Sequence, residues 1–488
     1  MGIRSLEGEW ESADERGKRE LTSFRITGWL TEREQLRTAP LSALSGTRLG
    51  IDFSAYVRKL LASPNPSTRD TFVAAVGGAP LALTVQIEKD LKSLEKAGVK
   101  PVFVFAGISP RERERPFLAE DPKNWRRAQA WEHYENGRVP QAQTEFGNST
   151  PVQAQDVMRI VHRLFKQRSV EFVVAPYLAT AQLVYLLRHD KAYVHSLYGP
   201  NELFLFEGID RVILNIDFAT STISFASKAA ILHELAINPD QFADAATLCG
   251  YEGVTTFPGI EPRGGEIAFR NVVDLVKARG SATGVIMAFP PIYSANYLDT
   301  FARARCIIKY SLVLVAPEGR LLPLPLALPP PPASLLPIAT INDIPSDLHD
   351  IFSPRFPDEV YYQIFRGLVG TQMISALASG HLIETTPLCG GTQEYERFVK
   401  GLTESPHSAR CVAIGLLSSV LHPMWPKKTV VCPLFSFPEV KADDFSSRRF
   451  TTLILDASTS SIILTPSLLH SLTELPSGTS IQDTLKKN

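Results

Sequence analysis

The chain has 488 residues, which is too long for one ordinary domain and predicts two or three. A hydrophobic fraction of 44% and a charged fraction of 21% exclude wholesale disorder. Fifty Lys and Arg residues balance 51 Asp and Glu residues, so the whole chain exerts no net attraction on phosphate. Any contact with nucleic acid must therefore come from a local patch or from a partner.

The cysteines and the N-terminus indicate the compartment. No Cys-x-x-Cys pair occurs among the five cysteines, which argues against a zinc ribbon or a disulfide framework and favours a reducing compartment. Residues 1–10 lack the apolar core of a secretory signal. No uncharged apolar stretch is long enough to span a bilayer. We expect a cytoplasmic protein with no membrane association.

The first regular elements alternate between strand and helix. Residues 48–53 (RLGIDF) predict a short buried strand, and residues 53–61 a helix. A longer helix is predicted over residues 80–97, where Leu83, Ile87, Leu91 and Leu94 form one apolar face. The apolar run at residues 99–105 then predicts a strand buried on both faces, which completes a βαβ unit.

The same alternation continues further along the chain. A helical stripe at residues 157–165 precedes a strand at 170–175 and a helix at 181–188. Further strands are predicted at 203–206 and 211–216. This order indicates an α/β sandwich with a mostly parallel central sheet.

A proline-rich segment predicts the main domain boundary. Residues 321–337 read LLPLPLALPPPPASLLP, and proline fixes its own backbone and lacks an amide donor. We predict a stiff linker over residues 321–343, with a PxxP partner site as the less favoured alternative. Residues 344–391 have strong helical content, so a smaller, mainly helical region should follow.

Four motifs, in this order, resemble the XPG and flap-endonuclease superfamily, which has a PIN-like fold. They are MGIRSL (1–6), LGIDFSAYVRKLL (49–61), KPVFVFAG (100–107) and VVAPYLATAQLVYLL (173–187). The resemblance implies that residues 1–320 form a PIN-like, flap-endonuclease-like α/β domain. Residues near 250–280, with Pro258-Gly259-Ile260, are similar to a degenerate helix-two-turn-helix.

The resemblance also implies where metal ligands would stand. This superfamily holds two divalent ions through several carboxylates, because Mg²⁺ and Mn²⁺ prefer anionic oxygen. Acids remain at three of the seven positions: Asp52, Glu202 and Glu252. The other four positions carry Ala106, Leu178, Thr180 and Pro200. We therefore expect no nuclease activity and no cofactor, beyond at most one weakly bound Mg²⁺ or Mn²⁺.

Each remaining acid also has an ordinary structural interpretation. Asp52 ends a strand and could cap the following helix, which we favour because its partners are missing. Glu202 and Glu252 are then surface acids. The Arg-Glu alternation at residues 111–115 is typical of a solvated loop.

A branch of the superfamily is similar in the second part of the chain. Residues 344–370, the PLCGG at 387–391 and the LYGP at 197–200 resemble the maintenance-of-killer-toxin family of fungal post-transcriptional regulators. The resemblance implies that residues 344–488 are the start of a family-specific C-terminal domain, truncated if the chain is a fragment. It also implies mRNA regulation through 3′ untranslated regions, on polysomes or in granules. The implied partner is an ataxin-2-like factor associated with poly(A)-binding protein.

Three functions remain open at this point. The first is a non-catalytic scaffold on a nuclease fold, whose contact with mRNA is indirect. The second is a structure-specific, Mg²⁺-dependent endonuclease of the flap-endonuclease type. The third is a direct RNA-binding module, which would need a basic, aromatic-lined groove. The replaced acids favour the first.

Overall fold

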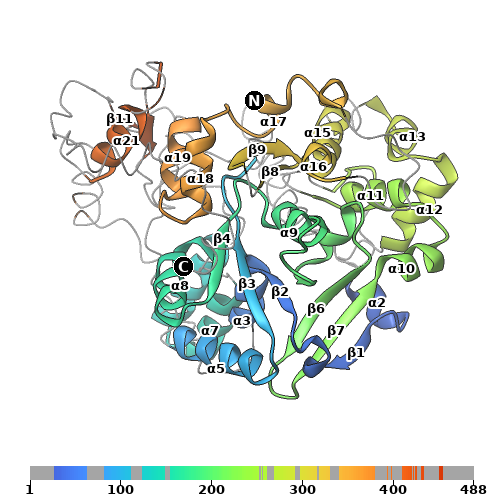
Figure 1. Ribbon diagram of the computed structural model, residues 1–488, viewed down its shortest axis with the longest axis horizontal. Helices are drawn as coiled ribbons and strands as arrows, with labels where there is room; N and C mark the ends of the chain where they lie inside the picture. The colour runs from blue at the N-terminus through green and yellow to red at the C-terminus, as the bar shows by residue number, and fades with distance from the viewer. Residues whose placement is uncertain are drawn as a thin grey trace.

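A computed structural model describes the following residues: 27–62, 82–110, 124–148, 154–251, 254, 256–260, 269–291, 297–315, 318–329 and 340–379, with short pieces between 393 and 453 (Figure 1). No helix in this part of the chain is long and apolar enough to cross a membrane. Glu252 and the loop at residues 111–115 lie outside these ranges, as do residues 261–268 in the middle of the expected helix-two-turn-helix.

A seven-stranded sheet organises the α/β unit, with the strand order β1-β7-β6-β5-β2-β3-β4. Strands β6, β5, β2, β3 and β4 run parallel to one another, β7 pairs antiparallel with β6, and β1 pairs antiparallel with β7. The strands are β1 (Arg37–Pro40), β2 (Arg48–Asp52), β3 (Lys100–Phe105), β4 (Glu171–Val174), β5 (Ser196–Tyr198), β6 (Arg211–Asp217) and β7 (Thr222–Ser227). The predicted mostly parallel sheet is confirmed, and the three buried runs at 48–53, 99–105 and 170–175 share it.

Helices cover both faces of the sheet (Figure 1). From β2 the chain moves through β3 to β4, and right-handed crossovers place the intervening helices on one face. From β4 it returns to the other side of β2, so α9 (Ala179–Arg188) packs on the opposite face. The first face carries α3 (Phe53–Ala62), α5 (Leu83–Lys96) and α8 (Ala154–Arg168). Successive strands are added on one side of β2 up to β4 and on its other side from β5 onward. In open α/β sheets, ligands bind at the carboxyl ends of the strands where this order changes.

One strand prediction is wrong, and three strands of the seven-stranded sheet were missed, as were the four described strands outside it. Residues 201–205 form a 3-10 helix, η4 (Asn201–Leu205), where we expected a strand. Its Leu203 and Phe204 are buried because η4 packs against α9 and β6. A short apolar run alone does not distinguish a buried strand from a buried helical turn. The missed strands β1 and β5 are short, and the sequences of β1, β5 and β7 are rich in Ser and Thr or carry charge.

The first part of the proline-rich segment is not a linker. Strand β9 (Arg320–Pro323) pairs with β8 (Leu312–Val315), and α16 (Leu324–Ala327) follows directly. Leucines alternate with the prolines here, and Leu321, Leu324 and Leu328 are buried. Pro325 lies in the first turn of α16, where the missing amide hydrogen costs nothing. Residues 330–339 lie outside the described residues, so a linker there stays a prediction.

The region after residue 340 is mainly helical where the structure describes it. It contains α17 (Leu348–Ile351), α18 (Asp358–Phe365), α19 (Thr371–Ser379) and α21 (Ala409–Ser419), together with the antiparallel strands β10 (Val430–Pro433) and β11 (Phe450–Leu453). Helix α18 packs against β4, β8 and β9, and its buried side chains belong to the same hydrophobic core as the α/β unit. The expected helical character is therefore confirmed, while the boundary between domains stays a prediction.

Candidate functional site

The positions singled out by the superfamily resemblance lie at one edge of the sheet. Asp52 is the last residue of β2, and Ala106 directly follows β3. Leu178 follows β4 and precedes α9, and Pro200 follows β5. These four strands are parallel neighbours, so their carboxyl ends meet at the same edge. The expected position of Asp52, at the carboxyl end of a central parallel strand, is confirmed.

Asp52 is buried, and its carboxylate accepts a hydrogen bond from the nearby backbone. Its Oδ1 accepts a hydrogen bond of 2.8 Å from the backbone N–H of Ala55, in the first turn of α3. This is the geometry of a helix N-cap. Gly199 passes close by, since a Cβ on it would lie 3.3 Å from the Asp52 Cβ and 2.7 Å from the Leu203 Cδ1. The carboxylate is thus enclosed by backbone and hydrocarbon on that side.

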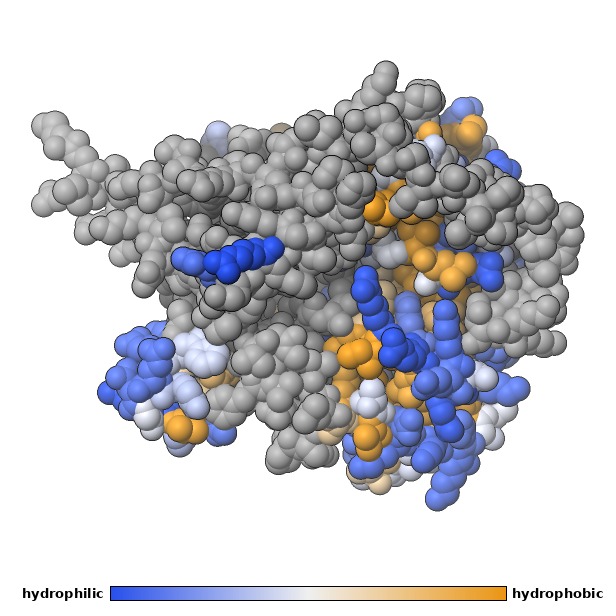
Figure 2. Space-filling model, turned by 90° about the vertical axis from the view of Figure 1, so that its left-hand side faces the viewer, coloured by the Kyte–Doolittle hydropathy of each residue, from blue (hydrophilic) through white to orange (hydrophobic). Residues whose placement is uncertain are grey.

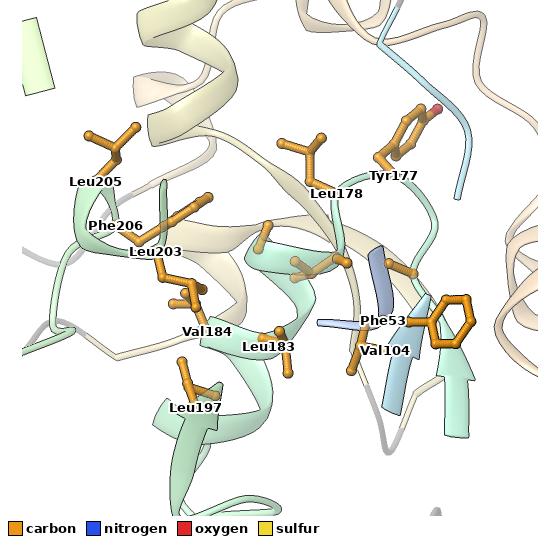
Figure 3. Packing of buried hydrophobic residues seen from close by; sticks show 14 of the residues in the cluster. Phe53, Val104, Tyr177, Leu178, Leu183, Val184, Leu197, Leu203, Leu205 and Phe206 are labelled. Carbon is orange, nitrogen blue, oxygen red and sulfur yellow. The ribbon is translucent and has the colours of Figure 1, made fainter. Parts of the chain in front are cut away.

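Of the four positions without a carboxylate, Leu178 is buried, and Ala106, Thr180 and Pro200 are half-buried. Leu178 is buried at the N-cap of α9, and its side chain lies apart from those of Phe53 and Val104 (Figure 3). The segments after β3 and β4 stay paired, because the N–H groups of Gly107 and Ile108 donate to the carbonyls of Tyr177 and Pro176 at 2.8 and 2.9 Å. This edge presents hydrocarbon and paired backbone where a hard cation needs anionic oxygen.

The other acids do not complete a cluster in the described structure. Glu202 lies in η4 and is half-buried, and Glu252 lies outside the described residues. Among the described side chains, no three of the His, Cys, Asp and Glu residues gather closely enough to hold a metal ion. The roles of the three acids, and the absence of a cofactor, stay predictions.

A polar cluster on the inner side of α3 and α5 was missed from the sequence. The Tyr56 hydroxyl donates to Asp90 Oδ2 at 2.8 Å, and Gln86 Nε2 donates to Oδ1 at 2.9 Å. Burial raises the pKa of Asp90, although its two hydrogen bonds oppose this shift. A signal was present in the sequence, because Asp90 falls between Ile87 and Leu91 on the apolar face of its helix.

Tyr198 connects this cluster with the sheet edge. Its ring ends β5, and the Lys59 ammonium group lies 5.0 Å from the ring centroid. Burial raises the pKa of the Tyr198 phenol, and the negative charges of Asp90 and Asp52 raise it further. The phenol therefore stays neutral and can donate a hydrogen bond, but it cannot act as an anionic metal ligand.

The C-terminal region closes over the loop that carries Leu178. The hydroxyl of the preceding residue, Tyr177, lies 2.6 Å from Ser353 Oγ and 3.0 Å from the Tyr361 hydroxyl. The Phe352 ring meets the Tyr177 ring nearly edge-on, with centroids 5.1 Å apart. Residues 352–361 thus pack against the loop after β4, at the edge of the sheet where a nuclease of this fold would bind its metal ions.

The sheet order, the helices on both faces and the position of Asp52 define an α/β protein of the XPG and flap-endonuclease type. A family model described as "XPG N-terminal domain" matches residues 26–116. A second model, "Temperature dependent protein affecting M2 dsRNA replication" (MKT1_N), matches residues 345–435. The chain belongs to the MKT1 family, with an XPG-like fold in its first part.

Two curated relatives match most of this chain. The chain is 40% identical over 420 residues to the "Post-transcriptional regulator MKT1" of Cryptococcus neoformans, a match that covers 84% of this chain and 53% of the relative. It is 28% identical to the protein of the same name in Schizosaccharomyces pombe, over 74% of this chain and 48% of the relative. The chain therefore spans about half the length of the curated relatives that it matches. A solved flap endonuclease-1 from Methanococcus jannaschii is 18% identical, with a TM-score of 0.37, over 55% of this chain and 80% of that structure.

Proposed function

We propose that this chain is a post-transcriptional regulator of mRNA that controls translation or stability through 3′ untranslated regions. It acts as a non-catalytic scaffold on a nuclease fold. Leu178 supports this proposal most directly, because a buried hydrocarbon stands at a position where the fold would need a carboxylate. The names of the curated relatives support the regulatory part.

A reporter assay tests this function. The gene is deleted in its host, and luciferase reporters that differ only in their 3′ untranslated regions are compared for protein yield and mRNA half-life. We expect a subset of reporters to change, and re-expression of the chain to reverse the change. Unchanged yields and half-lives for all reporters, including those carrying the most affected native regions, would overturn the proposal.

We further propose that the chain works in the cytoplasm, on polysomes or in RNA granules, with an ataxin-2-like partner that associates with poly(A)-binding protein. The support is the family membership and the packed helical region after residue 340. Affinity purification of the full chain, followed by mass spectrometry with and without ribonuclease, tests the partner. We expect the factor to be recovered after ribonuclease treatment. Recovery only through RNA, or no recovery, would contradict a direct complex.

A further inference from the structure

The outer faces of two neighbouring helices carry parallel rows of cations. Helix α5 buries Leu83, Ile87, Leu91 and Leu94, while Lys89, Lys92 and Lys96 are exposed on the opposite side. Helix α8 does the same, with Val157, Val161, Leu164 and Phe165 buried and Arg159, Arg163 and Lys166 exposed. In each row the residues are three or four apart, so they project from one side of the helix. We call these six side chains the α5–α8 basic surface.

The two rows belong to one continuous face. Both helices pack on the same side of the sheet, and Arg168 of α8 reaches Glu95 of α5 at 3.5 Å. Figure 2 views the molecule from the side on which α8 and α5 lie in Figure 1, and hydrophilic side chains gather in the lower part of this view. Because packed helices lie about 8–10 Å apart, the rows form a broad surface rather than a single ridge.

The charge of this surface is not neutralised by the described side chains. No ion pair between described residues includes any of the six cations, whereas Arg168 and Arg305 elsewhere are paired with Glu95 and with Asp240 and Asp244. The exposed acid Glu95 is thus engaged at the edge of the surface. Helix α5 also carries Glu88, which is half-buried, and Asp90, which is buried, so the exposed cations outnumber the acids on a surface of a chain whose formal net charge is −1.

We propose that the α5–α8 basic surface binds the sugar–phosphate backbone of RNA. The inference rests on the proposed function, and it replaces the expectation that contact with mRNA is only indirect. Rows of Lys and Arg spaced along a helix match a repeating anion, and release of condensed counterions supplies the affinity. The outer faces of these helices carry no exposed aromatic ring, so bases cannot stack there and the contact is independent of sequence. Charge complementarity favours RNA, while the exposed Val85 and Ile160 make an acidic protein the competitor to test.

Salt-dependent binding of the full chain to fluorescein-labelled oligouridine tests the proposal. Two variants neutralise one row each: Lys89→Gln with Lys92→Gln and Lys96→Gln, and Arg159→Gln with Arg163→Gln and Lys166→Gln. A control removes the same charge from exposed cations elsewhere, with Arg211→Gln, Arg279→Gln and Arg320→Gln. Each phosphate contact contributes about −0.7 to the slope of log K against log salt, so the slope should be about −4 for six contacts and about −2 for each row variant. Affinity should fall at least about tenfold in each row variant and much less in the control.

Several outcomes would overturn the inference. Failure of the wild-type chain to bind the oligouridine is one of them. A control that loses as much affinity as the row variants is another, because the effect would then come from net charge alone. Displacement of the RNA by polyglutamate at equal charge concentration would assign the surface to an acidic protein. Thermal melts of every variant show whether each is folded. The reporter assay separates the two proposals: row variants that still regulate reporters refute RNA binding here but leave the regulatory function standing.

Discussion

The hydroxyl groups of Tyr177 and Tyr361 lie 3.0 Å apart, although 184 positions separate them in the sequence. Tyr177 belongs to the loop after β4, and Tyr361 belongs to α18 in the region matched by the MKT1_N model. Ser353 completes the contact at 2.6 Å from Tyr177. The region matched by the MKT1_N model is therefore anchored to the α/β unit at the loop where the family resemblance would place acids.

Tyr361→Phe should weaken this anchor. The Tyr361 hydroxyl also accepts a hydrogen bond of 3.2 Å from the backbone N–H of Phe356, which would lose its acceptor in a buried site. We expect the free energy of unfolding to fall by about 1–3 kcal/mol, measured by urea denaturation. Tyr362→Phe is the matched control, because Tyr362 is half-buried and its hydroxyl makes no hydrogen bond to a described residue. Equal losses in the two variants would show that the buried network adds no stability.

His162 should make the fold sensitive to acid. Its ring stacks on Phe172 with centroids 4.5 Å apart, and burial, followed by the nearby charge of Lys166, lowers its pKa to about 4. The fold therefore favours the neutral imidazole. Its stabilising contribution is complete above the unfolded pKa of about 6.5 and is lost as the pH falls from about 6.5 to 4. We expect a loss of at most about 3 kcal/mol over this range, measured by chemical denaturation at several pH values.

His162→Phe supplies the control for this effect. An apolar ring can occupy the space between Phe105 and Phe172 without taking up a proton. The variant should lose clearly less stability than the wild type between pH 6.5 and 4, because the remaining loss comes only from other groups. Identical pH profiles for the two proteins would rule out His162 as the source.

Gly107→Ala should be strongly destabilising. A Cβ on Gly107 would lie 1.9 Å from the carbonyl oxygen of Ala175, so the paired segments after β3 and β4 would have to separate. We expect a loss of about 1–3 kcal/mol or more. Gly415→Ala is the control, because α21 offers open space at Gly415 and alanine is the better helix former. A neutral Gly107→Ala variant would show that this edge of the sheet is looser than the structure indicates.

The sheet could be predicted because its strands have simple patterns. Continuous apolar runs at β2, β3 and β4, separated by a helix with one apolar face, indicate buried parallel strands. Strands β1 and β7 could not be found in this way, because they form the antiparallel edge and their side chains are mixed. Likewise, the density of prolines predicted a linker that included residues 321–328. These residues form β9 and α16 instead, because the leucines between the prolines are buried in the core.

The edge of the sheet could be predicted only in part. Asp52 ends a recognisable strand, and its neighbours were located through a family resemblance that fixes the order of motifs. The cluster of Tyr56, Gln86 and Asp90 depends on how two helices pack, which no local pattern specifies. The contact between Tyr177 and Tyr361 could not be predicted either, because the residues are 184 positions apart and neither segment has a pattern that indicates the other.

Two substitutions of Asp52 separate its structural role from a metal-binding role. Asp52→Asn keeps a side-chain oxygen for the Ala55 N–H, whereas Asp52→Ala removes it. We expect Asp52→Ala to lose about 1 kcal/mol of stability and Asp52→Asn to lose much less, because Asn and Asp are similarly good N-caps. Thermal melts measure the difference. Equal destabilisation by both variants would show that the negative charge, and not the cap, stabilises the fold.

The same pair of variants also tests catalysis. In-line attack on a phosphodiester gathers negative charge that metal ions must offset, and metal ions stay only where oriented carboxylates hold them. Ala106, Leu178, Thr180 and Pro200 supply none. We therefore expect only background cleavage of a 5′-flap duplex, with Mg²⁺ or Mn²⁺, by the wild type and by both Asp52 variants. Robust metal-dependent cleavage by the wild type that disappears in Asp52→Asn, a variant that keeps the helix cap, would replace the scaffold with a working endonuclease. Cleavage that persists in both variants would instead point to a contaminating nuclease, because Asp52 is the acid that this fold places at the carboxyl end of its central strand.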